Sequence, residues 1–240
     1  MSRRAFRMRA VSNVRLFSIR SWGEEALRPS VPMPGSPWPH DMLITIDGGP
    51  NTLVDVLWVR EAWNLHPVGD DLPPLLSDDW VRARAQIGST DAIATWSDAW
   101  PRIWNACIDH AGLVQDSTML NQLQHTLDGA PERIDLLARM FGPSWRGSLG
   151  DDAFTDEHGT WNFAQFQARM KSRSTPYGDD PERLALSALI PAWQAGLTKI
   201  VTVPCQGSYT RVIGQHTLLV TDETRDHYQR YSEALKLFRS

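Results

Sequence analysis

The sequence predicts an α+β fold, in which one mostly helical domain holds a small sheet of about three strands and ends in a C-terminal helix. Apolar residues recur at steps of three and four through the middle of the chain, which is the period of helices packed on a core. Short runs of β-branched and apolar residues occur at residues 42–46 and in the C-terminal part. These runs predict a sheet that combines one N-terminal strand with a C-terminal strand pair.

The compact domain is expected to span residues 42–240. Residues 1–23 contain six arginines and no acidic residue, and residues 29–39 contain five prolines. Such a proline density fits an extended linker better than a helix or a strand. We therefore predict that residues 1–41 are a basic tail and a proline-rich linker, which are either disordered or precede a true start at Met42.

Two helices are expected to form much of the core. Residues 53–65 are apolar at nine of 13 positions, so this helix should be buried on most sides. Residues 90–112 carry tryptophan and isoleucine at helical steps. Pro101 lies inside that second helix and is expected to kink or divide it, because proline removes a backbone donor.

The remaining elements follow from capping residues and from a change of period. Residues 198–204 and 217–221 are strand-like runs joined by a glycine-containing connection, which predicts a hairpin or two adjacent strands. The other expected helices are a polar helix from Ser77, helices over residues 131–141, 161–171 and 180–196, and a closing helix capped by Asp222 or Asp226.

Charge and cysteine usage exclude several classes of protein. The formal net charge is -4, but without residues 1–23 the chain has 18 basic and 28 acidic side chains, a net charge of -10. A body this acidic repels polyphosphate, so the folded domain is not expected to bind nucleic acid. Two cysteines in a chain of this size indicate a reducing compartment rather than a disulfide scaffold. No apolar run approaches the roughly 18 residues of a membrane-spanning helix.

Eleven tryptophans are the strongest feature of the composition. Several share one helical face, and an aromatic platform of this kind can stack on sugars, bases or cations. Packing in the core explains the same pattern, because isoleucines and Cys107 alternate with these tryptophans. The candidate ligand groove consists of Trp96, Trp100, Trp104, Trp145 and Trp161.

Residues 151–158 gather four carboxylates and one imidazole. Oxygen ligands suit Mg²⁺ or Ca²⁺, and an imidazole suits a transition metal. The EF-hand pattern is absent, so a solvated acidic loop is the alternative. The candidate metal ligands are Asp151, Asp152, Asp156 and His158.

Cys205, His216 and Asp222 follow one another in the order that would activate a thiolate through a histidine. The alternative is that Cys205 is a small buried hydrophobe at the end of a strand. These three residues are the weak candidates for a catalytic site.

The sequence contains no GxGxxG, GxxxxGK[ST], HExxH or GxSxG pattern. We therefore expect a cytoplasmic, bacterial, non-catalytic interaction or accessory domain that acts on an unidentified protein partner and needs no cofactor. Its interaction surface would be an apolar patch near Trp145 and Trp161. The alternatives are a metal-dependent, hydrolase-like enzyme that uses the acidic loop and, after it, a Cys205 thiol hydrolase.

Overall fold

The computed structural model describes residues 24–26, 37–83, 85–86, 90–114, 118–143, 146–150, 153–172 and 180–239. Most of the predicted tail and linker, residues 1–41, therefore lies outside the described residues, as do Trp145, Asp151 and Asp152.

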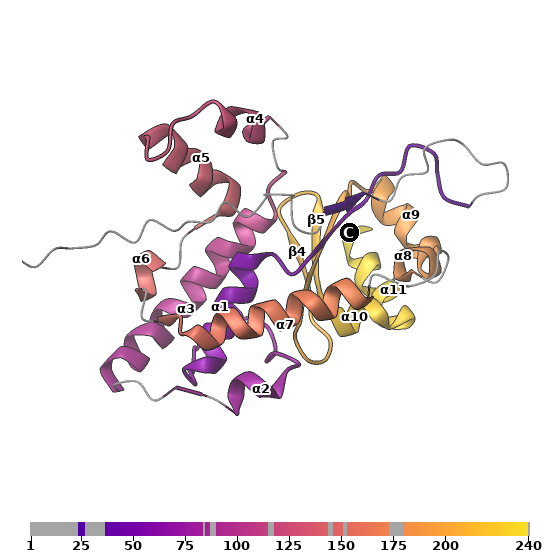
Figure 1. The fold of residues 1–240 in the computed structure, drawn as a ribbon. Coiled ribbons are helices and arrows are strands. Elements are labelled where there is room, and N and C mark those ends of the chain that lie inside the picture. The colour runs from indigo at the N-terminus through magenta and orange to yellow at the C-terminus, as the bar shows by residue number, and fades with distance from the viewer. Residues whose placement is uncertain are drawn as a thin grey trace, which may run out of the picture.

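A five-stranded mixed sheet forms the centre of the molecule, with the strand order β1-β2-β3-β5-β4 (Figure 1). Its middle is parallel and consists of β2 (Thr45–Gly48), β3 (Lys199–Val203) and β5 (Thr217–Thr221). The edge strands β1 (Glu24–Ala26) and β4 (Thr210–Ile213) pair antiparallel with β2 and β5. The α+β class and the joining of N-terminal and C-terminal strands are confirmed, although the strand count is larger than expected.

Of the two arrangements expected for residues 198–204 and 217–221, the structure has the pair of adjacent strands and not the hairpin. β3 and β5 run parallel, with Lys199 opposite Thr217. The chain between them forms β4, which makes the hairpin with β5. Every residue of β3 and β5 is buried, because helices cover both faces of this part of the sheet.

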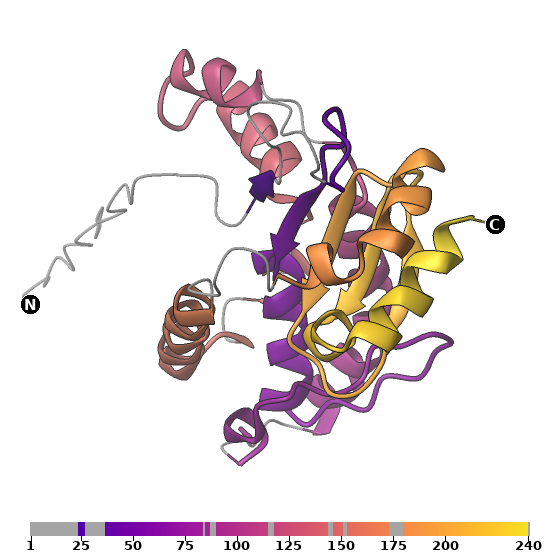
Figure 2. The same cartoon turned by 90° about the vertical axis from the view of Figure 1, so that its right-hand side faces the viewer.

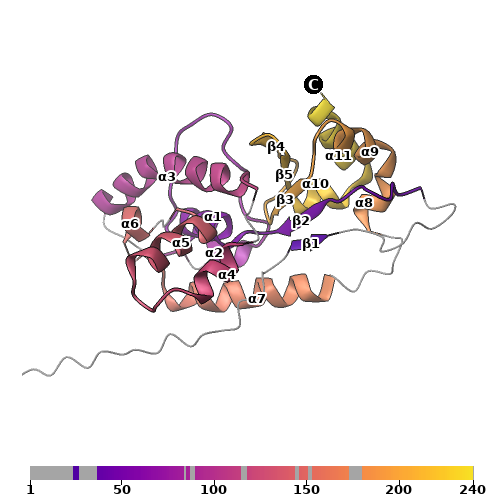
Figure 3. The ribbon, with the colours of Figure 1, turned by 90° about the horizontal axis from the view of Figure 1, so that it is seen from above.

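One face of the sheet is covered by α1 (Asn51–Ala62) and α3 (Thr90–Ala111), and the other face by α9 (Leu186–Gln194) and α11 (Tyr228–Lys236) (Figures 2 and 3). Side chains alternate along each strand, so one set of strand residues joins each core. The core next to α1 includes Val201, Val203 and Leu219, and the core next to α9 and α11 includes Ile200, Leu218 and Val220.

α1 and α3 agree with the helices expected at residues 53–65 and 90–112. α1 is buried on most sides, as its composition predicted. α3 continues through Pro101 as one helix, so the expected division of this helix is wrong. Trp100 and Trp104 stack within α3, with ring centroids 5.5 Å apart, and pack in the core.

Buried charged side chains hold loops and short helices against these layers. Glu182 lies in α8 (Pro181–Leu184) and is fully buried, and it accepts hydrogen bonds from Arg225 of α10 (Asp222–Asp226). On the other side of the sheet, Arg60 donates to the carbonyls of Pro73 and Pro74. This arginine therefore holds the loop after α1 against the core.

The closing helix is in fact two helices with different caps from those expected. Thr221 is the N-cap of α10, where its hydroxyl accepts from the backbone N–H of Thr224. His227 is the N-cap of α11. The predicted caps Asp222 and Asp226 are instead the first and last residues of α10, because the helix begins directly after the buried end of β5.

The remaining described helices lie around α1 and α3, except for a short C-terminal 3-10 helix that packs on α9 and α11. α4 (Met119–Gln124) and α5 (Pro131–Phe141) pack on each other and project beyond the end of α3 (Figures 1 and 2). The other elements are α2 (Asp79–Arg82), α6 (Arg146–Leu149), α7 (Asp156–Ser172) and the short 3-10 helix Leu237–Arg239.

Candidate ligand-binding site

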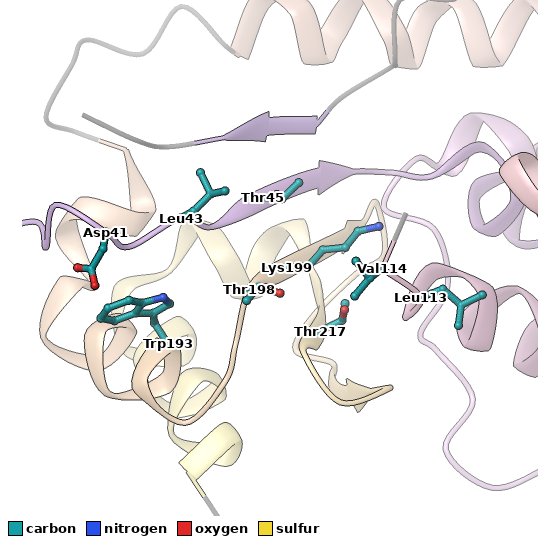
Figure 4. Close-up of a pocket in the computed structure, with 9 residues that line it drawn as sticks. All are labelled: Asp41, Leu43, Thr45, Leu113, Val114, Trp193, Thr198, Lys199 and Thr217. Carbon is teal, nitrogen blue, oxygen red and sulfur yellow. The ribbon is translucent and has the colours of Figure 1, made fainter. Parts of the chain in front are cut away.

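A pocket lies at the edge of the sheet where the three parallel strands begin (Figure 4). Register places Lys199 of β3 between Thr45 of β2 and Thr217 of β5. The three side chains belong to one face of the sheet, because residues in register on neighbouring strands point the same way. We call Thr45, Lys199 and Thr217 the strand-start row. It contributes two hydroxyls and an ammonium group to the lining of the pocket.

The ammonium group of this row is held by an ion pair. Lys199 Nζ lies 3.2 Å from Asp47 Oδ2, and the two side chains are 10% and 13% exposed. Asp47 follows Thr45 by two residues on the same strand face, so the parallel pairing of β2 and β3 brings it beside Lys199. Asp47 is not among the residues that line the pocket. It therefore fixes the lysine from outside the pocket.

Apolar side chains form most of the remaining wall. Leu43 precedes β2, Trp193 comes from α9, and Leu113 and Val114 follow α3. Leu43, Leu113 and Val114 are 41%, 59% and 77% exposed, which is high for large apolar side chains. The full lining is Asp41, Leu43, Thr45, Leu113, Val114, Trp193, Thr198, Lys199 and Thr217.

The pocket has the size and the chemistry of a small-molecule site. Its volume is about 410 Å³, within the range of roughly 300–1,000 Å³ typical of ligand pockets. Such sites combine apolar walls with a few polar groups that orient the ligand. Here the strand-start row, Thr198 and Asp41 supply the polar groups, and Trp193 supplies an aromatic surface.

Three of the five tryptophans predicted to form a ligand groove are core residues. Trp100 donates from Nε1 to the Val56 carbonyl at 2.8 Å, and both Trp100 and Trp104 are buried. Trp96 is partly buried and meets the ring of Trp63 edge to face. Their positions at helical steps therefore place Trp100 and Trp104 in the core and Trp96 at its edge.

Trp161 was also expected to form part of an exposed apolar patch. It is 2% exposed, and its Nε1 donates to Asp78 Oδ2 at 3.1 Å. Residues 156–160 are helical, so the sequence around Trp161 is not a loop. The other residue of that expected patch, Trp145, lies outside the described residues.

Two of the four predicted metal ligands lie in the first turn of α7. Asp156 is exposed, whereas His158 is half-buried and its Nε2 lies 2.8 Å from Asp55 Oδ1 of α1. The rings of Trp58 and Phe154 flank the imidazole. Within the described ranges no group of three or more His, Cys, Asp and Glu residues is arranged to hold a metal ion.

The structure does not bring Cys205 and His216 together. The backbone carbonyl of His216 accepts from the Thr198 N–H just before β3, whereas Cys205 follows the end of β3. The five residue steps from Thr198 to Val203 alone span roughly 17 Å of extended chain. His216 Nδ1 instead lies 2.9 Å from the Gly196 carbonyl oxygen.

Burial raises the pKa of the Cys205 thiol to about 12, and the carboxylates of Glu61 and Asp222 act in the same direction while Arg60 opposes them. Burial likewise raises the pKa of Cys107 to about 12, with a further contribution from Asp55. Both cysteines are free and fully buried. Neither thiol is ionised near neutral pH.

Sequence reasoning missed the pocket, although one signal was present. Lys199 opens the run Lys-Ile-Val-Thr-Val, in which every residue is buried. A lysine at a buried strand position needs a partner or a function, because a buried charge is costly unless it is compensated. The partner, Asp47, stands at the end of the first predicted strand.

Among the described helices, none has both the length and the apolar character required to cross a membrane. Comparison of the chain with protein-family models, curated proteins and solved structures gave no match.

Proposed function

We propose that this chain is a non-catalytic accessory domain that binds a small organic molecule in the pocket around the strand-start row. The observation that carries the proposal is the nearly buried Lys199, which lines a hollow of about 410 Å³ and is fixed from outside by Asp47. Preorganised polar groups at the end of an apolar pocket orient a ligand at little entropic cost.

The chemistry of the two thiols supports binding over nucleophilic catalysis. A pKa of about 12 keeps Cys107 and Cys205 protonated at neutral pH, and the thiolate is the nucleophile in thiol enzymes. The separation of Cys205 from His216 also weighs against the thiol hydrolase alternative.

In this proposal the domain is cytoplasmic and acts on a protein partner rather than on nucleic acid. Free buried cysteines suit a reducing compartment. The net charge of -10 outside residues 1–23 opposes binding to polyphosphate. An accessory domain without its own catalytic group would exert its effect by changing the behaviour of another protein when the ligand binds.

A ligand-observed fluorine NMR screen of the full chain tests the proposal. The library consists of fluorinated fragments with aromatic or aliphatic bodies and varied polar groups. The matched variants are Thr198→Trp, which places a bulky ring at the pocket wall, and Thr160→Trp, which places the same ring on the exposed side of α7. Circular dichroism melting confirms that each variant is folded.

We expect several fragments to bind the unaltered chain and the Thr160→Trp variant, and to lose binding in Thr198→Trp. The absence of any bound fragment would overturn the proposal. Fragments that bind all three proteins equally would also overturn it, because binding would then lie outside the pocket.

A second candidate function is the metal-dependent hydrolase, and the Asp55–His158 pair favours it. Metal-binding histidines commonly have their second ring nitrogen oriented by a carboxylate, and Asp55 lies 2.8 Å from His158 Nε2. Calorimetric titration with Zn²⁺ and Mn²⁺ should then give heat that His158→Ala abolishes and His125→Ala, at an exposed position on another helix end, retains. No heat with either metal would rule out this alternative.

A further inference from the structure

We infer that the ligand of this pocket is an organic carboxylate with an apolar body, bound with its carboxylate at the strand-start row. The inference rests on the proposed function, because it assigns a chemical class to the ligand of the same pocket. It is carried by the charges and hydroxyls of the lining and by the spacing between its polar and apolar parts.

Lys199 is the only cationic residue among the nine that line the pocket, all of which the structure describes. Thr45 and Thr217 lie on either side of it in register. The ammonium and the two hydroxyls can each donate a hydrogen bond to a carboxylate, and charge-assisted bonds are roughly twice as strong as neutral ones. Asp47 holds the ammonium group through the ion pair from outside the pocket.

Asp41 is the only anionic residue of the lining, and it lies at the opposite end of the pocket, beside Trp193 (Figure 4). It precedes Thr45 by four residues, which corresponds to about 13 Å along an extended chain. At that distance most of the repulsion between exposed charges is screened, since the Debye length is about 8 Å at physiological salt. The anionic group of a ligand is therefore favoured at the row and disfavoured at the mouth near Asp41.

The apolar walls set the position of the ligand body. Leu43 precedes Thr45 by two residues on the same side of the chain, about 7 Å away by strand geometry. A ring joined to a carboxylate by about three carbon atoms spans such a distance. The exposed side chains of Leu43, Leu113 and Val114 would be covered by a body at this position. Covering exposed apolar side chains is the favourable contribution expected from such contact.

Three probes with the same apolar body and different end groups show whether binding depends on the charge of the end group or only on burial of the body. They are 4-phenylbutyrate, 4-phenylbutanol and 4-phenylbutylamine, titrated into the full chain by calorimetry at physiological salt. We expect the carboxylate to bind at least tenfold more tightly than the alcohol and the amine, because only the carboxylate pairs with Lys199.

Two sets of variants locate this preference. Leu43→Asp and Leu43→Asn remove the same apolar contact at an exposed position of the lining, but only the first adds a negative charge. Relative to Leu43→Asn, Leu43→Asp should weaken phenylbutyrate about three- to tenfold and spare or strengthen phenylbutylamine. The double variant Asp47→Asn with Lys199→Met removes both charges without leaving one of them buried alone, and it should abolish the preference for the carboxylate. Lys236→Met, at an exposed lysine of α11, is the matched control and should leave the preference unchanged.

Failure of this inference can be told apart from failure of the proposed function. Equal binding of the three probes, or a carboxylate preference that survives the double variant, would overturn the carboxylate class while fragment binding at the pocket still supports the proposed function. The carboxylate class would also be overturned if none of the three probes bound while fluorinated fragments bound the unaltered chain and not Thr198→Trp. Absence of any fragment binding would overturn both.

Discussion

Glu182 and Arg225 form a bidentate ion pair, in which Arg225 Nε donates to Glu182 Oε1 and Nη2 donates to Oε2, both at 2.7 Å. Glu182 is fully buried and also accepts from the Tyr231 hydroxyl at 2.9 Å. The pair joins α8 to α10, and the tyrosine joins both to α11. The helical layer on this face of the sheet is therefore fastened by one carboxylate with three donors.

Removing one partner of this pair should destabilise the domain strongly. We expect Arg225→Met to lower the free energy of unfolding by about 3–5 kcal/mol, because it leaves the Glu182 carboxylate buried without its counter-charge. Glu182→Met combined with Arg225→Met should recover most of that loss, since no uncompensated charge remains. Urea unfolding at pH 7 measures both variants. A double variant no more stable than Arg225→Met would contradict the assignment of the loss to a stranded charge.

The buried thiols should make the domain lose stability at alkaline pH. Their pKa is raised from 9.0 to about 12 in the folded state, so folding keeps them protonated. This stability is fully present below pH 9 and is lost as the pH rises toward 12. A rise from pH 8 to pH 10.5 should lower the free energy of unfolding by about 2 kcal/mol for each thiol.

The variant Cys205→Ala isolates one thiol from the other groups that titrate in this range. It will lower stability at pH 8, because a buried side chain is shortened. The difference in free energy of unfolding between the unaltered chain and the variant should shrink by about 2 kcal/mol between pH 8 and pH 10.5. Urea unfolding across this range provides the measurement. A difference that does not change with pH would show that the folded thiol has an ordinary pKa.

The tryptophans of α3 should differ in their contribution to stability although they recur at regular helical steps. Trp100→Ala is expected to cost about 3–5 kcal/mol, because it opens a cavity and removes the indole hydrogen bond to the Val56 carbonyl. Trp96→Ala should cost clearly less, since Trp96 is only partly buried. Thermal and urea unfolding of the two variants give the comparison. Equal losses of unfolding free energy would contradict the finding that Trp100 is buried and Trp96 is partly exposed.

Strand and helix positions were largely predictable from the sequence, because period and β-branching are local properties. The direction of β5 relative to β3 was not, since either direction gives the same alternation. β4 escaped detection because Thr210 and Arg211 are half-buried and Val212 is exposed, so this edge strand shows no apolar run. The hairpin was therefore assigned to the two strongest runs instead of to β4 and β5.

The candidate site was less accessible to sequence reasoning than the fold. Its strand-start row consists of residues from β2, β3 and β5, and the parallel order of these strands alone makes them neighbours. The predicted sites relied on proximity in sequence, as in residues 151–158, or on residue order, as with Cys205 and His216. For example, His158 contacts Asp55, which lies in α1 and is far from His158 in the sequence.

Pro101 lies inside α3, yet the helix continues through it. Its missing backbone donor leaves the Ser97 carbonyl without the usual helical hydrogen bond. We expect Pro101→Ala to raise the free energy of unfolding by about 1–3 kcal/mol, because alanine restores that bond and removes the ring clash.

Pro131 provides the matched control for this substitution. It opens α5 at a position where the missing N–H would have had no helical partner. Pro131→Ala should therefore change the free energy of unfolding by less than about 0.5 kcal/mol. Urea unfolding of both variants distinguishes the two positions. If Pro101→Ala were neutral or destabilising, contacts of the proline ring with the loop at Gly69, where the two residues approach closely, would outweigh the lost hydrogen bond.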